Sequence, residues 1–301
     1  MHSKTHFFSS LTPVTNSVSL YIFSLLICLI FLSPTKCLAQ APINHYEQAS
    51  DDELKQAEHL FNLLFTQSSN TEAKTLAIKL GFTWKENKKN IYLKEMNTQN
   101  KRKTGKGEYR FSKIVKKGIA LQAPHRYHDK HTGVIVKKLF SQYDISSIAL
   151  NSLPRNAVTK GISASADLAH SDNNYHIAYS RAFANHFPHG NLIQLHGFNA
   201  KKRTSIIARD ADIIMSTASS WSSNYLFKVQ KCLSTQNWVS LRFPQQVKEL
   251  GATQNSIASV MRQLGHVGFT HLELNLSSRE AIVNDKSQLK RFAGCLLELV
   301  P

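Results

Sequence analysis

Apolar positions near the start of the chain return every three or four residues, which is the spacing of an amphipathic helix. The positions that show it are Leu54, Ala57, Leu60, Phe61 and Leu64. Ser50 and Glu53 form a capping-box pattern at the beginning of this helix. A second helix is predicted over residues 71–80 and ends at Gly81, and a strand is predicted over residues 90–94.

Beyond residue 118, short apolar runs alternate with helix-like patterns. The predicted strands cover residues 118–123, 145–150, 192–195, 205–208, 212–216, 239–243 and 269–275. The predicted helices cover residues 132–142, 174–187, 219–232, 256–264 and 287–299. This alternation is typical of an α/β fold with a mostly parallel, buried sheet flanked by helices. We therefore expect an N-terminal helical and β appendage over residues 42–115 and an α/β domain over residues 116–301.

The first forty residues have the pattern of an export signal. Lys4 is the only charged residue before a nearly unbroken apolar run over residues 20–32, and small residues stand at Ala39 and Ala41. A basic start, a short apolar segment and small residues at its end are typical of a secretory signal, whereas a membrane span needs about 20 apolar residues. We expect a signal peptide over residues 1–39 and a periplasmic or secreted protein. An uncleaved membrane anchor is the alternative.

The charge of the chain is strongly positive and unevenly distributed. Lys and Arg total 37 against 20 Asp and Glu, a formal net charge of +17, which favours contact with anionic material. Residues 85–117 alone hold twelve Lys or Arg and three acids. This segment is either a solvated hairpin and loop or a landing patch for an anionic cell-wall or membrane surface. Because the sequence has no nucleic-acid-binding motif, specific nucleic acid binding is not expected.

Four cysteines are too few for a disulfide-built scaffold or a multi-cysteine zinc module. Cys232 and Cys295 remain after removal of the signal. Outside the cytoplasm they form either a disulfide or two buried thiols.

Histidines gather in one stretch, with eight of the 14 between His125 and His196. His125 follows the apolar strand over residues 118–123, and sites in open α/β sheets lie beyond the carboxyl ends of strands. Asp129 is four residues further on. Zinc binds His nitrogen and carboxylate oxygen, so His125 and Asp129 are candidate ligands, with His128 and His131 competing for the ligand role.

Two later segments extend this candidate metal site. His196 ends another apolar strand, so its side chain and that of His125 can converge on one ion. In the strand over residues 269–275, Glu273 lies on the face opposite the leucines. A carboxylate buried there needs a cation, a donor or a reacting water; otherwise this is an edge strand with Glu273 in solvent. Zn²⁺ lowers the pKa of a bound water from 15.7 to about 7, and Glu273 would serve as the general base.

Arg155 and Asp167 lie between the two ligand strands in sequence. Arg155 is a candidate to hold a substrate carboxylate through two hydrogen bonds. Asp167 is a candidate to orient a ligand histidine. A surface arginine and a helix cap are the alternatives.

The order of these segments resembles the N-formylglutamate amidohydrolase family, over residues 118–280. These are zinc hydrolases with a carboxypeptidase-like α/β fold, and zinc-dependent cell-wall amidases are similar in outline. The resemblance implies that His125 and His196 are metal ligands, that Asp129 is the third and that Glu273 is the base. Carboxypeptidase-type sites place a Glu three residues after the first His. His128 holds that position here, so it stays the alternative ligand.

Together these features predict a secreted zinc-dependent hydrolase of amide or peptide bonds. Its substrate would be an N-acyl amino acid, a peptide or a cell-wall peptide that carries a carboxylate. The alternative is a non-catalytic extracytoplasmic protein whose basic segment binds an anionic polymer or membrane surface. A serine hydrolase is not expected, because the sequence has no Gly-x-Ser-x-Gly motif.

Overall fold

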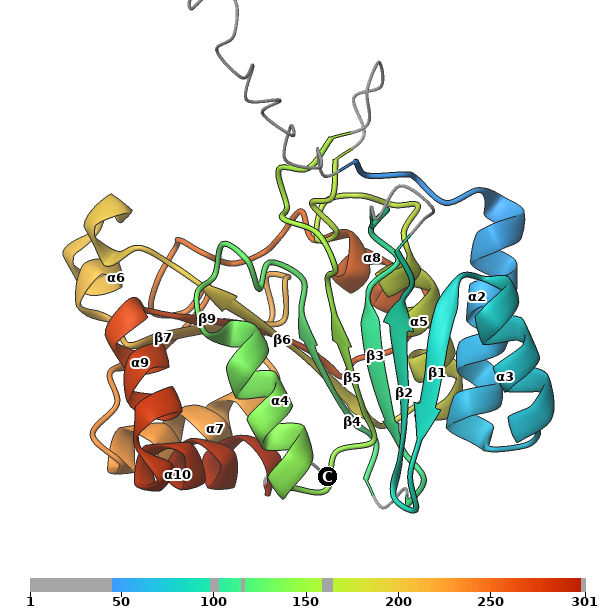
Figure 1. Ribbon diagram of the computed structural model, residues 1–301. Coiled ribbons are helices and arrows are strands. Elements are labelled where there is room, and N and C mark those ends of the chain that lie inside the picture. Colours follow the sequence, from blue (N-terminus) through green and yellow to red (C-terminus); the bar gives the residue numbers. More distant parts are fainter. Residues whose placement is uncertain (1–44, 98–102, 115–116, 159–164, 299–301) are drawn as a thin grey trace, which may run out of the picture. The chain divides into compact units, whose positions relative to one another are not determined.

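A single sheet organises the part of the chain that the computed structural model describes, residues 45–97, 103–114, 117–158 and 165–298 (Figure 1). The predicted signal, residues 1–39, lies outside these ranges. The sheet has nine strands in the order β1-β2-β3-β5-β4-β6-β9-β7-β8. They are β1 (Phe82–Glu86), β2 (Asn90–Glu95), β3 (Glu108–Ser112), β4 (Ile119–Ala123), β5 (Ser147–Leu150), β6 (Asn191–Gly197), β7 (Ile213–Ser216), β8 (Ser240–Arg242) and β9 (Phe269–Leu274).

Parallel pairing is concentrated at the centre of the sheet. Strands β5, β4, β6 and β9 run in the same direction, so their carboxyl ends lie at one edge. β1, β2 and β3 form an antiparallel meander, and β3 pairs with β5. β7 is antiparallel to β9 and parallel to β8. The predicted α/β fold with a helix-flanked sheet is confirmed, and β1, β2 and β3 belong to the same sheet as the strands of the expected α/β domain.

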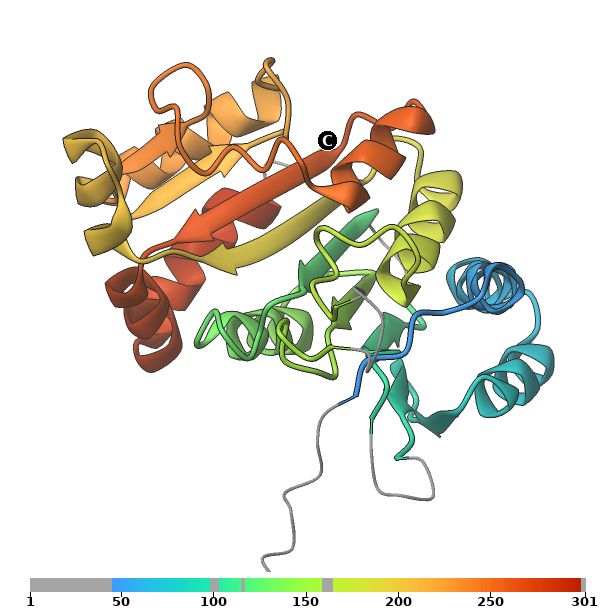
Figure 2. The same ribbon diagram turned by 90° about the horizontal axis from the view of Figure 1, so that it is seen from above.

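Helices cover both faces of this sheet. They are α2 (Asp51–Thr66), α3 (Asn70–Lys79), α4 (Thr132–Gln142), α5 (Tyr175–His186), α6 (Ile206–Asp210), α7 (Asn224–Thr235), α8 (Ser256–Gln263), α9 (Leu276–Asn284) and α10 (Lys286–Leu297), with a 3₁₀ turn over Ala200–Lys202. α2, α5 and α8 pack on one face, and α4, α7, α9 and α10 on the other. Figure 2 shows α4 and α9 on one side of the sheet and α5 and α8 on the other. Among the described helices, none has the length and apolarity to cross a membrane.

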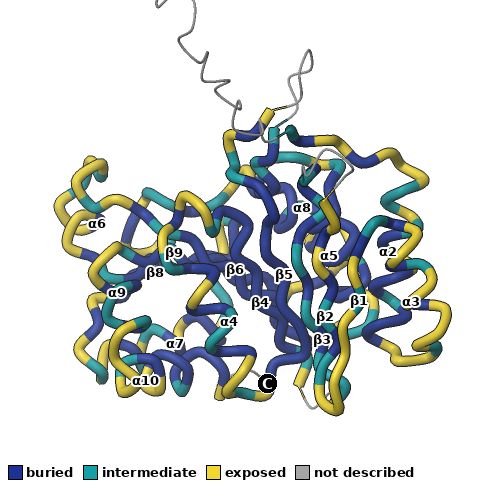
Figure 3. Tube along the Cα trace, viewed as in Figure 1, coloured by how far each residue is buried: buried dark blue, intermediate teal, exposed yellow. Residues whose placement is uncertain are grey.

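The central strands are buried along their lengths (Figure 3). In β4, Ile119 and Leu121 contribute to the core under α4, whereas Ala120 contributes to the core under α5. This two-sided burial explains why these strands appear in the sequence as nearly continuous apolar runs.

Several elements differ from the sequence prediction, and β1 and β3 are two strands that it did not include. Residues 205–208, predicted as a strand, begin the short helix α6. The Ser205 hydroxyl accepts a hydrogen bond from the Ala208 main-chain N–H, and the Glu249 carboxylate accepts from Ser205. Local capping has therefore overridden the β-propensity of the isoleucines. The helix α9 was not predicted; it begins after Asn275, whose side chain caps it.

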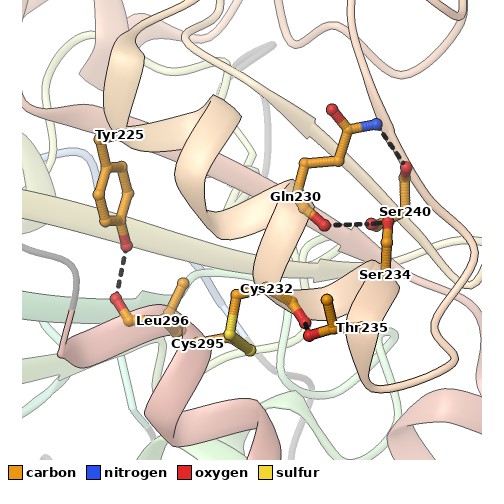
Figure 4. The surroundings of a disulfide bond; sticks show 8 residues. All are labelled: Tyr225, Gln230, Cys232, Ser234, Thr235, Ser240, Cys295 and Leu296. Atoms are coloured by element: carbon orange, nitrogen blue, oxygen red, sulfur yellow. Dashed lines mark hydrogen bonds between the residues drawn. A yellow bond between two sulfur atoms is a disulfide. The ribbon is translucent and has the colours of Figure 1, made fainter.

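Cys232 and Cys295 form a disulfide that joins α7 to α10 (Figure 4). Their Cα atoms are 5.4 Å apart and 63 residues separate them in sequence. The Tyr225 hydroxyl donates a 2.6 Å hydrogen bond to the Leu296 carbonyl between the same two helices. Of the two sequence alternatives for these cysteines, the structure has the disulfide.

Candidate metal centre

The sheet face beneath α5 and α8 changes from apolar to polar toward the carboxyl ends of the strands. Leu192 in β6 and Phe269 in β9 belong to the apolar core. Further along these strands, Gln194 pairs in register with His271, and His196 with Glu273. Side chains two apart in a strand share a face, so all four lie on the same face of the sheet. His196, His271 and Glu273 form the wall of a candidate site, and Gln194 is buried beneath it.

A tight turn after β4 brings two more of the predicted residues to the same place. The His125 carbonyl accepts hydrogen bonds from the main-chain N–H groups of His128 and Asp129, both at 2.8 Å. The Asp129 carbonyl then accepts from the Thr132 hydroxyl at 2.8 Å as α4 begins. The turn buries the side chains of His125 and Asp129 and leaves His128 exposed. His128 contributes instead to a neighbouring cavity.

Three donor atoms converge at this point. Asp129 Oδ2 lies 3.3 Å from His196 Nδ1 and 3.8 Å from His125 Nδ1. The two imidazole rings are 4.7 Å apart and nearly perpendicular. Asp129 Oδ2 is buried and receives no hydrogen bond of good geometry from the described residues. Ligands at about 2.0–2.1 Å from a tetrahedral zinc ion lie about 3.3 Å from one another. These three atoms therefore fit one such ion after a small movement of His125 and Asp129 toward each other.

His125 is oriented from its other side by Asp167. His125 Nε2 lies 2.7 Å from Asp167 Oδ1, and the same carboxylate contacts Arg155 Nη2 at 2.8 Å and His170 Nδ1 at 3.1 Å. Burial alone would raise the pKa of Asp167, but its hydrogen bonds with His125 and His170 hold that pKa well below its ordinary value. Asp167 is therefore a carboxylate behind a potential ligand histidine, an arrangement that fixes the ring and directs Nδ1 to the site.

Glu273 is nearly buried opposite Asp129. Its Oε2 atom has no hydrogen-bond partner among the described residues. Burial, followed by the nearby charge of Asp129, raises the pKa of Glu273 to about 8. A carboxyl group with its pKa near neutrality and a free oxygen is suited to accept and return a proton. The sequence alternative of a solvent-exposed Glu273 on an edge strand is wrong, since β9 lies between β6 and β7.

Besides His170, two further residues near this site were not singled out as site residues from the sequence. His271 Nε2 is 3.7 Å from Glu273 Oε1, and its ring is 4.7 Å from that of His196. His196, His271 and Glu273 form a second group able to hold a metal ion, next to the group of His125, Asp129 and His196. The alternation along β9 already placed His271 beside Glu273, and that signal was sufficient to find it.

Arg279 is the second missed residue. It is buried, and Nη1 donates to the Lys130 carbonyl at 2.6 Å. A Cβ atom at Gly197 would lie 2.4 Å from Arg279 Cζ, so this glycine makes room for the guanidinium. Burial lowers the pKa of Arg279, and the charges of Asp129 and Glu273 oppose that change. Arg279 thus places a fixed positive charge behind the two carboxylates.

A cavity of about 220 Å³ opens onto the candidate centre. Its lining includes His125, Asp129, Arg155, His170, His196 and Glu273. It is smaller than the roughly 300–1,000 Å³ typical of pockets for drug-sized ligands. The site is therefore sized for a small group or for one end of a longer molecule.

A scan against protein-family models and a search of curated proteins each found no match to this chain. Seven chains of solved structures resemble it, among them the following two. N-formylglutamate amidohydrolase from Ralstonia eutropha JMP134 has 9% sequence identity and a TM-score of 0.43, and the match covers 62% of this chain and 94% of that chain. Gene product Atu2144 from Agrobacterium tumefaciens has 12% identity and a TM-score of 0.40, with 62% and 90% covered. The likeness is one of fold.

Proposed function

We propose that this protein is a zinc-dependent hydrolase of amide or peptide bonds that acts outside the cytoplasm. The observation that carries the proposal is the convergence of Asp129 Oδ2 with His125 Nδ1 and His196 Nδ1 around one buried point. Asp129 Oδ2 has no hydrogen-bond partner there among the described residues. A buried carboxylate oxygen without a donor is costly, and a cation between these three atoms removes that cost.

The donor types fit zinc. Two imidazole nitrogens and one carboxylate oxygen, with a fourth position open, are typical of catalytic zinc sites. The same set also suits non-haem Fe(II), so the identity of the metal is itself part of the test. Bound zinc would supply a Lewis acid and a water with its pKa lowered to about 7.

The protein's own groups divide the remaining work. Asp167 holds His125 through Nε2, so that Nδ1 faces the site. Glu273 Oε2, which has no donor among the described residues, would take a proton from water and return it to the leaving nitrogen. Arg155 lines the cavity and uses Nη2 on Asp167. Its other N–H groups make no hydrogen bond to a described residue, so we assign them to a substrate carboxylate.

The proposed location is supported by two features. The pattern of residues 1–39 is that of a cleavable export signal. The disulfide between Cys232 and Cys295 is of a kind that persists in oxidising compartments. Both agree with a periplasmic or secreted protein.

Metal content and turnover of the same purified protein test this proposal. We expect one tightly held zinc ion per chain and hydrolysis of some N-acyl amino acids, short peptides or muropeptides. Chelation should abolish turnover and zinc should restore it. A chain that holds no metal and turns over none of these would support the non-catalytic alternative, in which the basic segment binds an anionic polymer. Several cations of that segment are already paired: Lys106 with Glu53, and Lys113 with Glu86.

A further inference from the structure

A chain of buried polar side chains lies beneath the candidate metal centre and takes no part in the chemistry proposed above. It consists of Gln122 on β4, Gln194 on β6, Ser180 on α5 and Asn255 at the start of α8. Each of these side chains is at most 3% exposed. Burying so many polar groups is costly unless every one of them is hydrogen-bonded. Here they are bonded to one another and to His196.

Ser180, the residue of this series furthest from His196, determines which atoms donate and which accept. Within α5, the Ser180 hydroxyl donates to the His176 carbonyl at 2.7 Å, and a main-chain carbonyl can only accept. Ser180 Oγ is therefore free to accept from Gln122 Nε2 at 3.0 Å. Gln122 then presents Oε1, which accepts from Gln194 Nε2 at 2.9 Å. Gln194 must consequently turn its own Oε1 toward His196.

The hydrogen bonds of Asn255 lead independently to the same orientation of the Gln194 amide. Asn255 Oδ1 accepts from the main-chain N–H of Ala258 at 3.0 Å, as the N-cap of α8. A main-chain N–H can only donate, so the other atom of this amide is Nδ2. Asn255 Nδ2 donates to Gln194 Oε1 at 2.7 Å. Two separate main-chain groups thus orient Gln194 in the same way.

The orientation of the Gln194 amide determines which nitrogen of the His196 imidazole carries the proton. Its Nε2 atom lies 2.9 Å from Gln194 Oε1, which is an acceptor. Its Nδ1 atom lies 3.3 Å from a second acceptor, Asp129 Oδ2, but that contact lacks the geometry of a hydrogen bond. The proton of the neutral ring therefore resides on Nε2. The lone pair then resides on Nδ1, the atom that lies 3.3 Å from Asp129 Oδ2.

We propose that Gln194, oriented by Gln122, Ser180 and Asn255, is a positioning residue that fixes His196 as the Nε2–H tautomer and so selects Nδ1 as its metal-binding atom. The selection of the binding atom rests on the proposed metal site, whereas the tautomer follows from the hydrogen bonds alone. The carboxylate of Asp167 orients His125 in the same way, through a contact with its Nε2 atom. An uncharged amide does the same for His196 without adding another carboxylate to a site that already has Asp129, Asp167 and Glu273.

The direct test is the tautomer of His196 in the metal-free wild-type protein. Nitrogen-15 NMR of histidine-labelled protein separates a protonated from an unprotonated ring nitrogen, and a His196→Gln variant identifies the resonances. We expect a protonated Nε2 and an unprotonated Nδ1. A ring protonated on Nδ1 overturns the proposal. This measurement needs no bound metal, so it decides the proposal even if the protein turns out not to be a zinc enzyme.

Variants of Gln194 then test the consequence for zinc. Gln194→Leu removes the acceptor, so we expect a mixture of tautomers and a zinc dissociation constant raised about 10- to 100-fold, the usual effect of losing an outer hydrogen-bond partner. Gln194→Glu keeps an acceptor and should keep the Nε2–H tautomer. The control is Gln230→Leu, which removes a partly buried glutamine of α7 that bonds to the Ser240 carbonyl and should change neither quantity. Zinc affinity in Gln194→Leu equal to that of the control contradicts the proposal. If that variant does not fold, the wild-type tautomer still decides it.

Discussion

Asp129 Oδ2 and His196 Nδ1 lie 3.3 Å apart, although one residue is in the loop after β4 and the other is at the end of β6. Neither atom is used by the hydrogen bonds that hold these side chains in place. Asp129 is positioned by the turn of its main chain, and His196 by Gln194 on its opposite nitrogen. The fold thus places two candidate metal-ligating atoms so that they face the same point.

Replacement of Glu273 separates binding from chemistry. Glu273→Gln keeps the shape of the side chain and removes the base. We expect this variant to fold, to retain zinc and to bind substrate, while turnover falls by at least about 100-fold, the low end for loss of a general base. Steady-state kinetics and metal analysis of one preparation check this, with Glu280→Gln, a more exposed carboxylate paired with Lys130, as the control. Loss of zinc together with activity would make Glu273 a ligand instead.

Glu273 also gives the metal-free protein a characteristic pH dependence. Its pKa in the fold is raised to about 8, so the folded state favours the protonated form. The stability that this provides is present below the ordinary pKa and is lost as the pH rises from about 4.5 through 8. We expect Glu273→Gln to flatten the dependence of the unfolding free energy on pH in that range, measured by urea denaturation in chelator. An unchanged slope would contradict the raised pKa.

Glu108 should stabilise the loop that carries His125. Its carboxylate on β3 contacts Arg126 at 2.9 Å, Arg110 at 3.0 Å and Lys137 at 3.2 Å. Burial would raise the pKa of Glu108, but the neighbouring cations, Arg126 foremost, lower it to about 2. The stabilisation is present above the ordinary pKa of about 4.5 and is lost as the pH falls toward 2.

Glu108→Gln should therefore lower the unfolding free energy at pH 7 by about 3 kcal/mol, and the difference from wild type should shrink on acidification. Urea denaturation at pH 7 and at pH 3 measures both values. Glu86→Gln, which breaks a more exposed pair with Lys113, is the control and should change stability little. A loss equal to that of the control would show that the cluster contributes little.

Removal of the disulfide should destabilise the fold without affecting the site. A cross-link between positions 63 residues apart lowers the conformational entropy of the unfolded chain. In the chain-entropy model this raises the unfolding free energy by about 4 kcal/mol. The Cys232→Ser, Cys295→Ser double variant should unfold at lower urea concentration and bind zinc as wild type does, because α7 and α10 pack on the face of the sheet away from the site. The same denaturation midpoint as the oxidised wild type would argue against this stabilisation.

Processing of the N-terminus is open to direct measurement. We expect the protein recovered from its native cells to begin near Gln40 or Pro42 and to be found outside the cytoplasm. N-terminal sequencing of the fractionated protein provides the result. Recovery of residues 1–39 in the native protein would instead favour an uncleaved anchor.

Part of the site could be predicted because its signals are local. A histidine directly after an apolar run places His125 and His196 at strand ends, and alternation places Glu273 on the polar face of β9. The remaining residues depend on partners far away in sequence. Gln122 and Gln194 look like interruptions of apolar strands until β4 and β6 are known to be neighbours. Arg279 lies on a helix that the pattern did not predict.

The direction of the outer strands was equally hidden. β7 is apolar in the same way whether it pairs parallel or antiparallel with β9, so hydrophobic pattern alone could not set its orientation. Residues 205–208 contain two isoleucines and favour a strand by composition. The Ser205 cap on the Ala208 N–H favours a helix instead, and Glu249, more than forty residues later, holds the Ser205 hydroxyl in place. This second contact is not visible in the local sequence.

The central claim is that His125, Asp129 and His196 hold one zinc ion. The most direct measurement is a crystal structure of the metal-loaded protein with diffraction data on both sides of the zinc absorption edge. The account predicts one anomalous peak about 2.0–2.2 Å from His125 Nδ1, Asp129 Oδ2 and His196 Nδ1. The peak should be lost in His125→Ala and His196→Ala, weakened in Asp129→Ala and unchanged in His128→Ala. A zinc-loaded protein with no peak between these three atoms would contradict the account.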